Sequence, residues 1–86
     1  MPQISHFLGI IIRMFYDEHN PPHFHAQYAE YKCSIDIQTF AVIEGELPPR
    51  VLGLVIEWAT THKDELMANW HHISKQEPLQ SIAPLQ

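Results

Sequence analysis

Short runs that alternate between hydrophobic and polar residues fill the first half of the chain, which is typical of β-strands. Leu8-Gly9 separates the first two runs, and glycine suits the positive φ of a tight turn. Prolines and polar residues at 17–22 predict a loop between the second and third runs. The runs that predict strands are 4–8, 10–16, 23–28, 31–37 and 39–44.

The third and fourth runs predict a hairpin with a defined register. If residues 29–30 form its turn, one face carries His23 opposite Asp36 and His25 opposite Ser34. The other face is then apolar throughout, which supports this pairing, although Ala-Glu is an unusual pair for a hairpin turn. The apolar face comprises Phe24, Ala26, Tyr28, Tyr31, Cys33, Ile35 and Ile37.

The second half of the chain has helical spacing. Pro48-Pro49 suits the first turn of a helix, and apolar residues recur every three or four positions from Val51 to Ile73. One helix of ~26 residues would be ~39 Å long, so we prefer a break near 61–64 and two helices to one long kinked helix. We place Trp58, His62 and Trp70 in the apolar stripe that faces the sheet.

These patterns predict an α+β fold in a single domain, residues 1–86. An antiparallel sheet of four or five strands occupies 1–47, and helices packed on one sheet face occupy 48–76. An extended tail occupies 77–86, because prolines interrupt it.

Composition narrows the classes of function. The net charge is -5, which disfavours nonspecific binding of nucleic acids, and seven histidines partly replace the usual charged residues. Cys33 is the only cysteine, so an internal disulfide and a cysteine-based zinc cluster within one chain are both excluded, and we expect the thiol to be buried and inert. No apolar run reaches the ~20 residues of a membrane span, and no signal peptide is recognisable. We therefore expect a cytoplasmic protein that does not contact membranes.

Three histidines within seven residues are the strongest chemical signal. His23 and His25 lie two apart on a strand, so both imidazoles point to the same side. The candidate ligands for a divalent metal are His19, His23 and His25, with Asp36 as a further ligand or an orienting carboxylate. The spacing matches no established zinc motif, so no cofactor is expected, and a divalent metal is kept as an alternative.

The same residues suit acid–base catalysis without metal. If the second and third strands pair as expected, Arg13 lies opposite His25. His23 and His25 would then act as acid and base, Arg13 would stabilise charge, and Asp36 would orient His23. A plainer interpretation is that this sheet face is solvated or covered by a partner protein.

The segment 19–26, which contains the pattern H-x-P-P-H-x-H, resembles a small bacterial family known as domain of unknown function 4160. Ala29-Glu30 departs from the glycine-containing turn common in that family. The motif positions are His19, Pro21, Pro22, His23 and His25, with Arg13 and Asp36 as weaker additions. Further similar segments are 1–4, 9–14, 35–37, 47–50, 57–59, 66–70 and the tail ending in Pro84-Leu85.

The resemblance implies a role, because members of that family are often encoded beside a second small protein in pairs that look like toxin–antitoxin operons. The leading hypothesis is a toxin-like component that cleaves RNA by acid–base catalysis. The alternatives are a non-enzymatic protein that binds its operon partner through the histidine-bearing face, and a small metal-binding protein. The expected partner is the small protein of the same operon, with RNA as a second candidate. The sequence leaves open whether the protein is an enzyme and which oligomer it forms.

Overall fold

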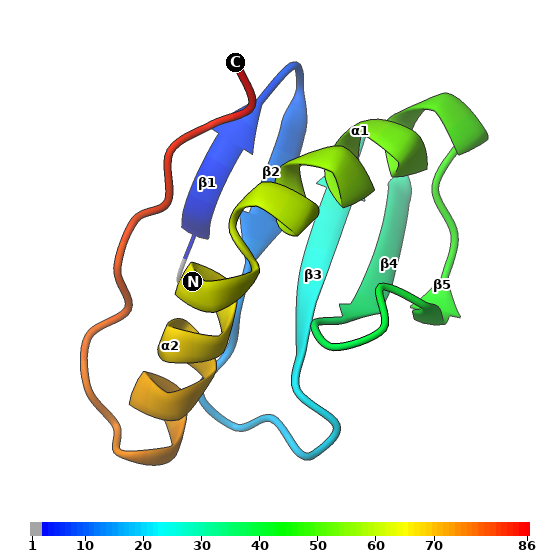
Figure 1. The fold of residues 1–86 in the computed structure, drawn as a ribbon. Coiled ribbons are helices and arrows are strands. Elements are labelled where there is room, and N and C mark those ends of the chain that lie inside the picture. The colour runs from blue at the N-terminus through cyan, green and yellow to red at the C-terminus, as the bar shows by residue number, and fades with distance from the viewer. Residues whose placement is uncertain (1–2) are drawn as a thin grey trace.

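Five antiparallel strands precede two helices along the chain (Figure 1). The computed structural model describes residues 3–86; residues 1 and 2, which the predicted sheet region and the resemblance include, lie outside the described part. The strands form one sheet in the order β1-β2-β3-β4-β5. The predicted α+β class is therefore confirmed. The elements are β1 (Gln3–Phe7), β2 (Ile10–Arg13), β3 (His23–Tyr28), β4 (Tyr31–Asp36), β5 (Val42–Gly45), α1 (Pro49–Thr61) and α2 (Lys63–Ser74).

The hairpin of β3 and β4 has the predicted register. His23 pairs with Asp36, His25 with Ser34 and Tyr28 with Tyr31. Its turn does use Ala29, which adopts a φ of 52° and so takes the positive-φ role that glycine usually fills.

The apolar face of the sheet forms the core together with α1 and α2, which both lie on that side of the sheet (Figure 1). Phe24, Ile35 and Trp58 are fully buried, as predicted. Trp70 is partly buried and packs against the core, and its ring is tilted toward that of His23 with 5.4 Å between ring centroids. Cys33 is buried on the apolar face, also as predicted.

The two helices meet at His62, where we expected a break. His62 has a φ of -113°, so the helix cannot continue through it, and no side chain caps the first turn of α2. The His62 ring packs on Trp58 with 5.5 Å between ring centroids. Among residues 3–86 no helix is both long and apolar enough to cross a membrane.

The C-terminal tail runs beside β1 and covers that edge of the sheet (Figure 1). The amide of Ile82 donates a hydrogen bond to the carbonyl of Ile4 at 2.8 Å. The Trp58 indole donates to the carbonyl of Ala83, also at 2.8 Å. Buried Ile82 and these bonds hold the extended tail to the body.

Two predicted strands differ from the structure by three residues at one end, whereas the ends of the other three differ by at most one residue. The second strand ends at Arg13 rather than at residue 16, so the following loop is longer than expected. The last strand begins at Val42 rather than at residue 39, because a tight turn occupies 36–40. Asp36 stabilises that turn: its carboxylate accepts the backbone amides of Gln38 and Thr39 at 2.7 and 2.9 Å.

Candidate functional site

A row of polar side chains crosses the sheet on the face opposite the helices. Arg13 of β2 pairs with His25 of β3, His25 pairs with Ser34 of β4, and Ser34 pairs with Glu44 of β5. Because strand side chains alternate between faces, directly paired residues point the same way. The register therefore aligns a cation, an imidazole, a hydroxyl and a carboxylate across four strands.

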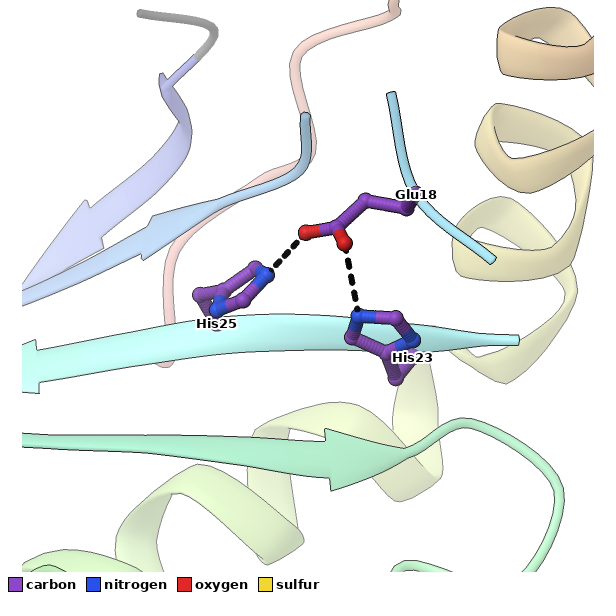
Figure 2. A group of neighbouring side chains, drawn as sticks. All are labelled: Glu18, His23 and His25. Carbon is purple, nitrogen blue, oxygen red and sulfur yellow. Dashed lines mark hydrogen bonds and ion pairs between the residues drawn. The ribbon is translucent and has the colours of Figure 1, made fainter. Parts of the chain in front are cut away.

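Figure 2 shows the carboxylate of Glu18 between the rings of His23 and His25. Its Oε2 is 3.4 Å from Nε2 of His23, and its Oε1 contacts Nε2 of His25. The two imidazoles come from β3, whereas Glu18 comes from the loop between β2 and β3. One ligand atom from each of the three residues lies within 4.8 Å of the other two.

The Nδ1 atom of each histidine ring also has a hydrogen-bond partner. Nδ1 of His23 lies 2.8 Å from the carbonyl oxygen of Pro21, and Nδ1 of His25 lies 3.2 Å from the hydroxyl of Ser34. The edge of the Phe15 ring packs on His25 at 4.7 Å between centroids. These contacts fix the orientation in which both Nε2 atoms face Glu18.

The side chains of Glu18, His23 and His25 are partly buried. The exposed fractions are 12% for His23, 22% for Glu18 and 30% for His25. A small ion or ligand can therefore reach the cluster from solvent.

Nε2 of His23 faces the Glu18 carboxylate across 3.4 Å. A carbonyl only accepts hydrogen bonds, so Nδ1 of His23 must carry the proton that it shares with Pro21. In the neutral tautomer Nε2 then presents a lone pair to the Glu18 carboxylate, which is repulsive. A proton shared between Nε2 and the carboxylate, or a metal ion beside both groups, would remove that repulsion.

Of the other predicted site residues, Asp36 and His19 lie outside the cluster. Asp36 was expected to orient His23, but its carboxylate is bonded to the backbone of its own turn, and Glu18 is the carboxylate that reaches His23. His19 is exposed and is not part of the three-residue cluster. Arg13 pairs with His25 as predicted, and its guanidinium donates to Oε1 of Gln27 at 2.6 Å.

Two hollows meet at His25, Ser34 and Glu44. One, of about 240 Å³, is lined by the histidine cluster and the loop that carries it. The other, of about 290 Å³, extends over the sheet and is lined by Arg13 and Lys32 among others. A ligand in the second hollow would therefore lie directly beside the cluster.

Other titratable groups lack this arrangement. His62 contacts Glu65 at 2.5 Å and His72 contacts Glu77 at 2.8 Å, and each of these pairs contains a single histidine. The hydrogen bond from His72 lowers the pKa of Glu77. Burial raises the pKa of the Cys33 thiol to about 11, which makes it a poor nucleophile.

Comparison with known proteins identifies a family and gives no activity. The family model described as Domain of unknown function (DUF4160) matches residues 9–71, which is well over half of the chain. Neither a curated protein nor a solved structure matches the chain significantly.

Proposed function

The chain belongs to the DUF4160 family, and from its own side chains we propose that it is a small protein that binds one divalent transition-metal ion through Glu18, His23 and His25. The observation that carries the proposal is the convergence of both Nε2 atoms on one carboxylate. Two imidazoles and a carboxylate suit zinc, and also iron, manganese or nickel.

The surroundings of the cluster support this proposal. Metal-binding histidines commonly donate their second ring N–H to a carbonyl or another acceptor, which fixes the tautomer and aims the other nitrogen at the ion. Pro21 gives His23 that acceptor, and Ser34 occupies the equivalent place beside His25. A metal ion beside both groups would remove the repulsion between Nε2 of His23 and the Glu18 carboxylate.

Three protein ligands leave coordination positions for water or a substrate, as in catalytic rather than structural zinc sites. A divalent ion held this way would act as a Lewis acid and would lower the pKa of a bound water. The adjoining hollows give a substrate access to those positions.

Metal content of the purified chain tests the proposal. After treatment with a chelator and dialysis against zinc, we expect one equivalent of zinc per chain by elemental analysis. Glu18→Gln, His23→Ala and His25→Ala should each lose most of it, because each removes one ligand. His62→Ala is the matched control, since it breaks a histidine–glutamate pair outside the cluster. Zinc retained by the three site variants, or absent from the wild type, would contradict the proposal.

We propose a second candidate, RNA-directed acid–base cleavage by a toxin-like component, on one observation. Arg13 pairs with His25, and His25 contacts Glu18, so a base, an acid and a cation lie side by side. Such groups contribute roughly 10²- to 10⁴-fold to a reaction without a metal. Induced expression with and without the neighbouring gene tests this role, together with RNA cleavage in the presence of a chelator.

The outcomes of that test separate the candidates. Cleavage that resists the chelator and disappears in His25→Ala supports acid–base catalysis. Cleavage that the chelator abolishes supports the metal site. If His25→Ala melts normally, keeps any growth inhibition and loses only its operon partner, the histidine-bearing face is a protein interface.

A further inference from the structure

We infer that the hollow over β2, β3 and β4 binds the phosphate group of a small phosphorylated ligand, with Arg13 and Lys32 as its cationic contacts. This inference rests on the proposed function in one respect, namely that the phosphate would lie beside the proposed metal centre. The ligand class that it names is for the hollow next to that centre.

The first observation is the distribution of positive charge. The chain has five lysines and arginines against ten acidic residues, and two of the five line this one hollow. No lysine or arginine of residues 3–86 forms an ion pair with a carboxylate, so these two differ from the other three in sharing one hollow. Two cations without an anionic partner in one concave site are typical of an anion-binding site.

The second observation is the arrangement of donors around Gln27. Arg13 pairs with His25, and Gln27 pairs with Lys32 on the same face of the sheet. Oε1 of Gln27 accepts a hydrogen bond from Arg13, so the amide NH₂ of Gln27 is left to donate. The guanidinium, this amide and the Lys32 ammonium thus offer donors from neighbouring positions that line one hollow, and a phosphate has acceptor oxygens for them.

A carboxylate at the opposite end of the hollow sets the position of the ligand. Glu44 lines the hollow from β5 and would repel an anion there. The phosphate is therefore expected at the β2–β3 end against Arg13, Gln27 and Lys32, and not against His25, whose ring contacts the Glu18 carboxylate. Phe15 adds an apolar wall for the rest of the ligand.

Size and net charge favour a small ligand over a polymer. The hollow of about 290 Å³ is at the lower end of the range for small-molecule sites. A net charge of -5 repels the many phosphates of an RNA chain, whereas two cations suffice for one phosphate.

Calorimetric titration of the chain of residues 1–86, with zinc and with a chelator, tests the inference. The probes are adenosine 5′-monophosphate, adenosine, and a short oligoribonucleotide without terminal phosphates. We expect the monophosphate to bind at least about ten-fold more tightly than adenosine, because only the former reaches the two cations. Binding of adenosine and its monophosphate with equal affinity would overturn the inference, and so would an oligoribonucleotide that binds ten-fold more tightly than the monophosphate.

Variants assign the effect to the two cations. Arg13→Gln is expected to weaken monophosphate binding about ten- to hundred-fold, and Lys32→Gln, at an exposed position, provides a second test that does not disturb folding. Arg50→Gln, on the exposed surface of α1, is the matched control and should bind normally. Glu44→Gln should strengthen binding because it removes the opposing charge. Unchanged affinity in both Arg13→Gln and Lys32→Gln would overturn the inference.

The same samples distinguish this inference from the proposed metal site. Arg13→Gln and Lys32→Gln should still bind one equivalent of zinc, because neither residue is a ligand. Monophosphate binding that is absent from a zinc-loaded wild type overturns the phosphate inference alone. Monophosphate binding that persists in a wild type unable to bind zinc overturns the metal site alone.

Discussion

Zinc is expected to stabilise the folded chain by an amount that the size of the protein makes easy to measure. An ion that binds only the folded state adds about 2.7 kcal/mol when its free concentration is a hundred times Kd. In a chain of this length, 1 kcal/mol moves the melting midpoint by about 4–8 °C, so the expected rise is about 11–22 °C. Zinc is expected to stabilise the unfolded chain little, because Glu18 and the two histidines come together when the loop folds over β3.

Thermal melts followed by circular dichroism, with zinc and with a chelator, measure this rise. Glu18→Gln and His25→Ala should show almost no zinc-dependent shift, whereas His62→Ala should shift as the wild type does. Both site variants should fold without zinc, since their side chains lie on the face away from the core. No shift in the wild type, or an equal shift in Glu18→Gln, would show that zinc does not stabilise the chain through this site.

Three further predictions concern single residues around the site. Gly45→Ala should lower the free energy of unfolding by about 2–4 kcal/mol in a denaturant titration, because a Cβ there would lie 2.2 Å from the carbonyl oxygen of Lys32 at a φ of +79°. An unchanged midpoint would contradict this expectation. With a thiol pKa of about 11, Cys33 should react with iodoacetamide at pH 8 at least about a hundred-fold more slowly in the folded chain than in the denatured chain, and equal rates would mean that it is accessible. Ser34→Ala should weaken zinc binding about 10- to 100-fold without a change in fold, because His25 loses the partner of its Nδ1; calorimetry that shows no change would rule out this positioning role.

The hairpin that carries the histidines could be predicted from its pattern together with its turn. A shift of one residue would have placed apolar side chains opposite polar ones, so burial excludes odd shifts, and a turn at residues 29–30 then selects the pairing that places His25 beside Ser34. The helix break at His62 could be predicted for a similar reason, since an unbroken helix would have been longer than the domain.

The carboxylate of the site could not be predicted in the same way. Asp36 was the natural choice because it lies directly opposite His23, but an aspartate followed by a turn binds the amides of that turn. Glu18 lies in a loop without periodicity, and the path of that loop over the sheet depends on its tertiary contacts. The available signal was a glutamate immediately before the H-N-P-P-H-F-H run, and it was not sufficient to choose between Asp17, Glu18 and Asp36.

A zinc-soaked crystal, with anomalous diffraction recorded on both sides of the zinc absorption edge, shows whether Glu18, His23 and His25 bind a metal ion. We expect one strong anomalous peak within bonding distance of Nε2 of His23, Nε2 of His25 and the carboxylate of Glu18, at about 2.0–2.2 Å from each. A peak at the histidines of α2 instead, or a direct contact between Glu18 and His25 with no peak between them, would contradict the proposed metal site.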